Sequence, residues 1–202
     1  MKSTFESMQK SHSNGFSTLE SFYIPPSNEF LIQAVPEGNL KLDEMITLGL
    51  LKRSSLTGPI KKMLHAPTQK LFAVKEVPLS SREVRHLLKQ WLNRWEGLSK
   101  HEHFVEIFDT KWLTPEGCVS IICEFMNAGS LQDLLDTVGA VPENCLKEIA
   151  HQVLRGLDYL GVPHNCVSST QILFNKEARV KISLGIRSIS HPPPEQPSGS
   201  MA

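Results

Sequence analysis

The stretch at residues 58–79, GPIKKMLHAPTQKLFAVKEVPL, contains two short strand-like runs around a turn. The runs are 60–64 and 70–77, and the sequence HAPTQ at 65–69 separates them. Because successive side chains of a strand point to opposite faces, Lys75 shares a face with Ala73 and Val77. The stretch therefore predicts a β-hairpin that carries a lysine on one face of a sheet.

The next residues, SSREVRHLLKQWLNRWEGLSK at 80–100, have the 3.6-residue periodicity of an amphipathic helix. Ser80 or Ser81 is the expected N-cap. The apolar stripe that should face the core consists of Val84, Leu87, Leu88, Trp91, Leu92, Trp95 and Leu98.

Further elements are expected on both sides of this hairpin and helix. Strands are predicted at 43–51, 104–113 and 118–126, helices at 127–138 and 142–160, and two short strands at 167–174 and 178–184. The apolar stripe of the longer helix consists of Ile149, Val153, Leu154, Leu157 and Leu160. Five strands with one helix between the third and fourth, followed by helices, indicate an α+β fold.

Bulk composition argues against several functional classes. The chain has 202 residues, and its 21 basic and 21 acidic residues cancel, so no net charge favours nucleic acid or membrane partners. The N-terminus lacks the apolar core of a signal peptide, and no apolar run approaches the ~18 residues of a membrane span. The four cysteines show no CxxC spacing and are expected to be reduced thiols in the cytoplasm, without a metal. The HEH sequence at 101–103 lacks an evident third ligand, so a solvated turn is expected.

Several of these segments together resemble the protein kinase family, most closely its MAP kinase kinase group. HAPTQKLFAVKEV at 65–77 is similar to the second and third strands of the kinase small lobe. IICEFMNAGSLQDLL at 121–135 is similar to the hinge and the short helix after it. IAHQVLRGLDYL at 149–160 is similar to the helix that precedes the catalytic loop.

This resemblance implies a domain organisation. A small lobe, with a five-stranded antiparallel sheet and one helix, is expected at 41–127, and an incomplete helical large lobe at 128–188. The polar segment 1–40 and the Pro-rich segment 189–202 are expected to be disordered tails. A kinase continues beyond this point with an activation segment and further helices. We therefore expect a truncated domain in which part of the apolar stripe at 142–160 is uncovered.

An adenine slot between the lobes is also implied by the resemblance. Its residues would be Gly58, Ile60, Ala73, Lys75, Glu124, Met126 and Leu173, with Lys75 in the place of the phosphate-pairing lysine. An apolar slot with hinge backbone groups can bind a purine without magnesium. We therefore expect no required cofactor and at most weak, metal-independent ATP binding. The alternative for Lys75 is a strand lysine whose ammonium reaches the solvent.

The groups that would prepare Lys75 and the phosphates for catalysis are missing. Of the glycine-rich loop, Gly58 remains, but the two earlier glycine places fall on Arg53 and Ser55, unless Gly49 is used with an insertion. A carboxylate that would pair with Lys75 is expected near 90–92, where the sequence is Gln-Trp-Leu.

The catalytic loop itself corresponds to VPHNCVSSTQILFN at 162–175. His164 keeps the histidine place, and Asn165 replaces the arginine. The catalytic aspartate, the lysine and the metal-binding asparagine are replaced by Cys166, Ser168 and Gln171. A thiol is neutral near pH 7 at its ordinary pKa of about 8.5, so Cys166 cannot serve as a carboxylate base.

The second metal ligand of a kinase is an aspartate. Depending on the alignment, Ser183 or Leu184 takes its place, and neither is a charged ligand. The sequence therefore predicts no catalytic residue and no metal site.

These substitutions favour a truncated pseudokinase that acts as a binding or regulatory module, with a protein of a MAP kinase cascade as its partner. The first alternative is an active protein kinase that uses displaced carboxylates such as Asp158 or Glu177. The second is a degenerate gene copy whose product has no function and no cooperative unfolding transition.

Overall fold

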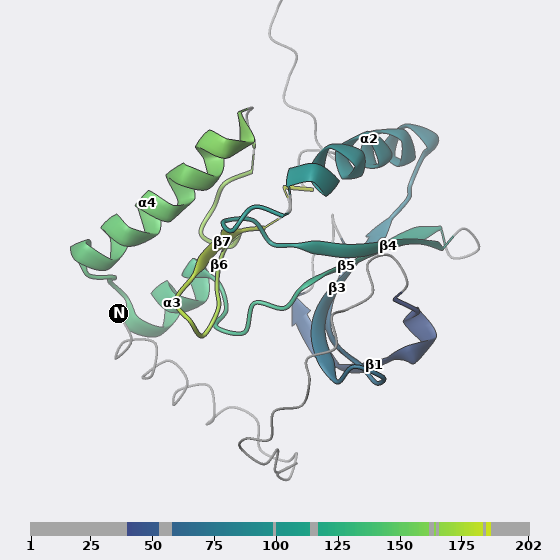
Figure 1. Cartoon of the computed structure of the whole chain (residues 1–202), viewed down its shortest axis with the longest axis horizontal. Helices are drawn as coiled ribbons and strands as arrows, with labels where there is room; N and C mark the ends of the chain where they lie inside the picture. Colours follow the sequence, from purple (N-terminus) through teal and green to yellow (C-terminus); the bar gives the residue numbers. More distant parts are fainter. Residues whose placement is uncertain are drawn as a thin grey trace, which may run out of the picture.

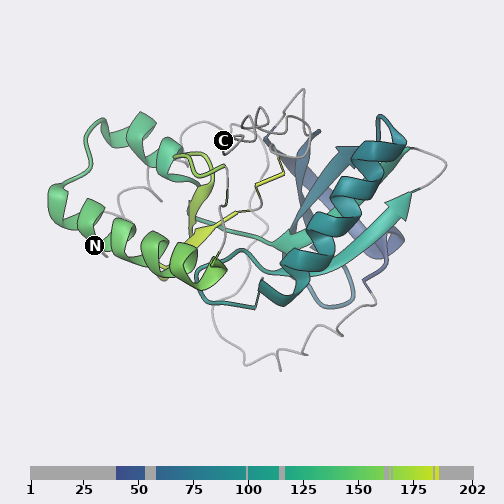
Figure 2. The ribbon, with the colours of Figure 1, turned by 90° about the horizontal axis from the view of Figure 1, so that it is seen from above.

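The structure is a computed structural model that describes residues 40–52, 58–98, 100–113, 117–161, 164, 166–183 and 185–186. Two parts lie side by side: a sheet with helix α2, and a smaller group that consists of helices α3 and α4 with the hairpin β6–β7 (Figures 1 and 2). This arrangement confirms the predicted α+β fold. The tail segments 1–39 and 189–202 lie outside the described residues, whereas Leu40, expected at the end of the first tail, is only 1% exposed.

The five predicted strands form one antiparallel sheet. They are β1 (Met45–Lys52), β2 (Ile60–His65), β3 (Lys70–Pro78), β4 (Ile107–Leu113) and β5 (Cys118–Glu124), in the spatial order β1-β2-β3-β5-β4. A short 3₁₀ helix, Leu42–Glu44, leads into β1. The strand bounds agree with the sequence prediction to within a few residues.

The two faces of the sheet have separate cores. On the outer face, a cluster consists of Leu40, Met45, Met63, Phe72, Val74 and Ile122. The inner face carries Val77, Val119 and Ile121, which belong to the central cluster shared with α2 and the helical part. The parity predicted for β3 is confirmed, since Val77 and Lys75 lie on one face and Phe72 and Val74 on the other.

Helix α2 (Arg82–Leu98) lies across the inner face of the sheet (Figure 2). Ser81 caps it, because its Oγ accepts the Val84 N–H at 3.2 Å. Leu88, Leu92 and Trp95 are buried as predicted. Leu87 is 42% exposed, so its assignment to the core stripe was wrong. It lies at the edge of the stripe, beyond the sheet that the helix covers.

The helical part contains α3 (Leu131–Val138), α4 (Glu143–Leu160), β6 (Ile172–Phe174) and β7 (Val180–Ile182). Ser130 and Asp133 form a reciprocal capping box at the start of α3. On α4, Ile149, Val153 and Leu160 are buried, but Leu154 is 63% exposed and does not belong to the core. Residues 167–171 are loop and turn, so the strand predicted there begins only at Ile172.

The turn at 101–103 is not the solvated turn that was expected. His103 is 6% exposed, and its Nδ1 lies 3.2 Å from the carbonyl oxygen of Val180. A Cβ on Gly156 would lie 3.1 Å from the Cβ of His103, so the turn packs tightly on α4. In the described part of the chain, His, Cys, Asp and Glu side chains form no group of three that could hold a metal. No helix among the described residues is long and apolar enough to cross a membrane.

Candidate functional site

The inner face of the sheet brings three of the predicted slot residues together. The strand register aligns Ile60, Lys75 and Ile121 in one row across β2, β3 and β5. Ala73 and Cys123 lie in the neighbouring row, opposite Lys62. Side chains in one row of a sheet point to the same face, so Ile60, Ala73 and Lys75 share the face that is turned to the helical part.

Met126 and Leu173 are the other apolar residues of the predicted slot. Met126 follows β5, is 7% exposed and belongs to the central cluster that also contains Cys123. Leu173 on β6 packs against the same cluster. The hinge and β6 are fixed to each other, because the Phe174 N–H donates to the carbonyl of Gly129 at 2.8 Å and the Ala128 N–H donates to the carbonyl of Phe174 at 3.0 Å.

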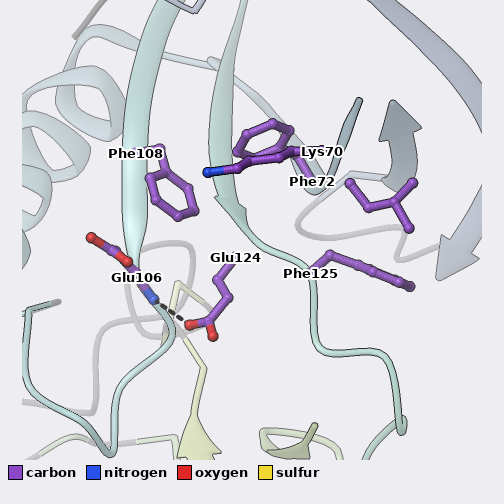
Figure 3. Close-up of a pocket in the computed structure, with 7 residues that line it drawn as sticks. Lys70, Phe72, Glu106, Phe108, Glu124 and Phe125 are labelled. Carbon is purple, nitrogen blue, oxygen red and sulfur yellow. Dashed lines mark hydrogen bonds between the residues drawn. The ribbon is translucent and has the colours of Figure 1, made fainter. Parts of the chain in front are cut away.

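The side chain of Glu124 points to the other side of the sheet. It is paired in the register with Phe72, an outer-face residue, and its carboxylate accepts a hydrogen bond from Lys181 Nζ at 2.6 Å. Glu124 lines a pocket of about 340 Å³ behind the hinge, with Lys70, Leu71, Phe72, Glu106, Phe108 and Phe125 (Figure 3). Of Glu124, only the backbone is placed to line an adenine slot.

Gly58 is fixed against the backbone of β3. Its φ is +73°, a region that favours glycine, and a Cβ at this position would lie 1.9 Å from the carbonyl oxygen of Glu76. The Glu76 N–H donates to the carbonyl of Pro59 at 3.0 Å in the same place. Gly58 is therefore required by this close approach of two backbones. Arg53 and Ser55, the places of the earlier loop glycines, lie outside the described residues.

Lys75 is a buried lysine that has no carboxylate partner among the described side chains. It is 9% exposed, which contradicts the alternative of a solvent-directed lysine. Burial lowers its pKa from the ordinary value, as does Lys52, while the thiols of Cys123 and Cys166 oppose the shift. None of these groups is a carboxylate. Burial also raises the pKa of Cys123 to about 12, so that thiol stays neutral.

The region of α2 that should supply the partner of Lys75 is apolar. Leu92 is 8% exposed and belongs to the central cluster, and Gln90 is exposed, with its Nε2 3.0 Å from His86 Nε2. Glu83 is exposed in the first turn of the helix. The segment 90–92 therefore offers Lys75 no carboxylate.

His164 keeps a structural role in the segment between α4 and β6. Its Nε2 donates to the carbonyl oxygen of Ser183 at 3.2 Å, and its ring meets Trp95 of α2 edge-on, with 5.7 Å between the centroids. Burial lowers the pKa of His164, and the Ser183 carbonyl opposes the shift. The ring is therefore neutral at neutral pH and joins α2 to this segment.

Gln171 and Ser183, which is one of the two candidates for the place of the metal-binding aspartate, are hydrogen-bonded to each other. The Ser183 hydroxyl donates to the Gln171 Oε1, and the Ser183 N–H donates to the Gln171 carbonyl at 2.8 Å. This pairing shows that Ser183 lies opposite Gln171; Leu184, the other candidate, is outside the described residues. A neutral amide and a hydroxyl that satisfy each other do not provide the anionic oxygen ligands that Mg²⁺ requires.

The other described catalytic-loop positions carry no carboxylate. Cys166 is half-buried and close enough to Lys75 to influence its pKa. Ser168 is exposed, and its Oγ lies 3.1 Å from the Oγ1 of Thr170. The residues that line this site therefore do not fit a magnesium-dependent phosphoryl transfer, which needs metal ligands and a base.

Sequence reasoning missed one residue of the site, Lys52. The register pairs Lys52 with Ile60, which in turn is paired with Lys75. Because β1 contains two register irregularities, simple alternation along the strand does not predict on which face of the sheet Lys52 lies. The sequence therefore showed the charge of Lys52 but not that its side chain shares a face with Lys75.

Comparison with known proteins identifies the class to which this architecture belongs. The family model described as the protein kinase domain matches residues 56–186, more than half of the chain. The chain therefore belongs to the protein kinase family.

Within that family, the similar proteins are MAP kinase kinases. Mitogen-activated protein kinase kinase 1 of Arabidopsis thaliana is 34% identical over 152 residues, which are 73% of this chain and 42% of that protein. The dual specificity mitogen-activated protein kinase kinase dSOR1 of Drosophila melanogaster is 32% identical over 161 residues, or 76% of this chain and 39% of that protein. The MAP kinase kinase PBS2 of Saccharomyces cerevisiae is 32% identical over 133 residues, or 63% of this chain and 19% of that protein. The chain thus spans less than half the length of these relatives.

Proposed function

We propose that this chain is a kinase-family protein that does not transfer phosphate and acts by binding, as a regulatory module in kinase signalling. The observation that carries the proposal is the pair of hydrogen bonds that Ser183 donates to Gln171, which joins neutral groups at the asparagine place and at one of the two candidate aspartate places. Cys166 at the position of the base supports it, since a cysteine side chain does not orient and deprotonate a substrate hydroxyl as a carboxylate does.

The partner we propose is a protein of a MAP kinase cascade, because the similar proteins are named as MAP kinase kinases. The proposed location is the cytoplasm, where free thiols such as those of the four cysteines are stable. The slot formed by Ile60, Ala73, Met126 and Leu173 supports weak purine binding, because apolar walls and hinge backbone groups need no metal.

An active kinase with displaced carboxylates is the second candidate, but no observation favours it. Asp158 is exposed on α4, and Glu177 is exposed in the turn between β6 and β7. Neither is among the groups that influence the pKa of Lys75. Neither carboxylate therefore supports this candidate.

A phosphoryl-transfer assay tests the proposal. The full chain is incubated with γ-labelled ATP, Mg²⁺ and a purified MAP kinase, beside a Lys75→Met variant as the matched control. We expect the same background label for both chains, together with binding of the MAP kinase to the immobilised natural chain. Transfer that disappears in Lys75→Met would show that the site is catalytic and would refute the proposal.

A further inference from the structure

We infer that the site at Lys75 is a metal-free anion site, in which the uncomplexed phosphate chain of a purine nucleotide binds and Mg²⁺ weakens binding instead of supporting it. This inference rests on the proposed function. The inference extends the proposed function, because a site without catalysis need not bind phosphates. In addition, a phosphate site of this family ordinarily works with magnesium.

The charge of the site is the first reason. In an active kinase, an aspartate and an asparagine hold the metal, and the metal then neutralises the phosphates. In the described residues of this site, those positions are Ser183 and Gln171, bonded to each other, and the position of the base is Cys166. The negative groups are gone, while the ammonium group of Lys75 remains and that of Lys52 lies on the same face, so an anion meets attraction without the repulsion that a metal would have to offset.

The arrangement of the two lysines is the second reason. Lys52, Ile60 and Lys75 occupy one row across β1, β2 and β3, so the two lysines share a face of the sheet with Ile60 between them. Neighbouring strands are about 4.8 Å apart, which places the two lysine backbones about 10 Å apart. A phosphate chain under Ile60 can therefore meet the ammonium groups of both lysines, one from each side.

Burial of Lys75 is the third reason. Its ammonium is largely withdrawn from water, and no carboxylate among the described groups offsets this. A buried charge without a partner is unfavourable, so an anion that provides the partner gains affinity from relief of that penalty. An exposed lysine such as Lys52 contributes less, because water already solvates it.

Magnesium acts against this site for the same reasons. Mg²⁺ bound to the β- and γ-phosphates reduces the negative charge that the lysines attract, and in the described residues it finds no anionic ligand in return. Metal and protein therefore compete for the same phosphate oxygens. Linked binding of this kind commonly changes affinity about 5- to 150-fold, and we expect a loss of at least about fivefold when Mg²⁺ is added.

Calorimetric titration of the full chain with ATP, in EDTA and then in saturating Mg²⁺, tests the inference. The natural chain should bind more tightly in EDTA. Lys75→Met should abolish this binding and Lys52→Met should weaken it. Lys70→Met is the matched control, because Lys70 is a lysine of the same strand that lines the pocket behind the hinge (Figure 3), and it should bind like the natural chain.

A double variant, Gln171→Asn with Ser183→Asp, checks the sign of the metal effect. Restoring an anionic metal ligand should make Mg²⁺ tighten ATP binding in this variant. Tighter binding of the natural chain in Mg²⁺, or equal losses in Lys70→Met and Lys75→Met, would overturn the inference. So would a lack of ATP binding in both buffers, but that result would leave the non-catalytic proposal intact, since the transfer assay tests it separately.

Discussion

Replacement of Lys75 by methionine should stabilise the folded chain, although Lys75 occupies the place of the phosphate-pairing lysine of a kinase. The side chain is 9% exposed, lies on the sheet face that α2 covers, and has no carboxylate among the groups that shift its pKa. Replacement of buried ionic groups by apolar side chains of similar volume stabilises proteins by about 1–4 kcal/mol. For a single ammonium group we expect the lower part of that range, about 1–2 kcal/mol.

Thermal and urea unfolding of the natural chain, Lys75→Met and the control Lys70→Met measure this effect. A gain of that size raises the midpoint by about 2–8 °C in a domain of this length. Lys70 is only partly buried, so its replacement should change stability by less than about 0.5 kcal/mol. A loss of more than about 1 kcal/mol in Lys75→Met, with no loss in Lys70→Met, would refute the reasoning, because it would show that Lys75 has a stabilising partner in the folded chain.

The stability difference between the natural chain and Lys75→Met should also depend on pH, in a direction set by the pKa of Lys75. Burial lowers the pKa of Lys75 in the folded state below the ordinary value of 10.5. Between the lowered pKa and 10.5, the unfolded chain binds more protons than the folded chain, so the stability of the natural chain rises with pH. The advantage of Lys75→Met should therefore be complete below the lowered pKa and should shrink as the pH rises toward 10.5.

Three further substitutions test the packing that positions the site. Gly58→Ala should lower the free energy of unfolding in urea by at least about 1–2 kcal/mol, because φ is +73° and the new Cβ would lie 1.9 Å from the Glu76 carbonyl oxygen. The control Gly49→Ala, which has open space around its Cβ, should change the free energy of unfolding little. Phe104→Ala should lower the free energy of unfolding by about 3–5 kcal/mol in the same assay, since Phe104 is 0% exposed in the central cluster. The control Trp112→Ala should lower it clearly less, because Trp112 is 39% exposed. Equal losses of stability would show that the central cluster does not hold the two parts together. Ser130→Ala should cost about 1 kcal/mol through loss of the capping box of α3, against no measurable change for the exposed Ser168→Ala.

Sequence periodicity was sufficient for the strands and helices that have one clear apolar face. The hairpin of β2 and β3 and the buried positions Leu88, Leu92 and Trp95 of α2 follow from it directly. Periodicity could not decide the edges of each stripe. Leu87 and Leu154 are apolar and correctly spaced, but whether such an edge residue is covered depends on neighbouring elements that are distant in the sequence.

The identity of the substituted catalytic positions was predictable, but their interactions were not. Motif spacing placed Cys166, Gln171 and Ser183 or Leu184 in the site. Only the structure shows that Ser183 and Gln171 bond to each other, because the two residues are brought together by the β6–β7 hairpin. His103 was assigned to a solvated turn because its buried partner, the carbonyl of Val180, lies 77 positions away in the sequence.

Titration of Mn²⁺ and ATP into the full chain, followed by electron paramagnetic resonance, tests the central claim most directly. Mn²⁺ is bound by the same oxygen ligands as Mg²⁺, and its spectrum reports whether the metal–nucleotide complex is held by a protein. The mutual bonding of Gln171 and Ser183 predicts the spectrum of free Mn²⁺–ATP for the natural chain and an immobilised signal for the double variant Gln171→Asn, Ser183→Asp. An immobilised Mn²⁺–ATP signal from the natural chain would contradict the account and show that the site holds a metal.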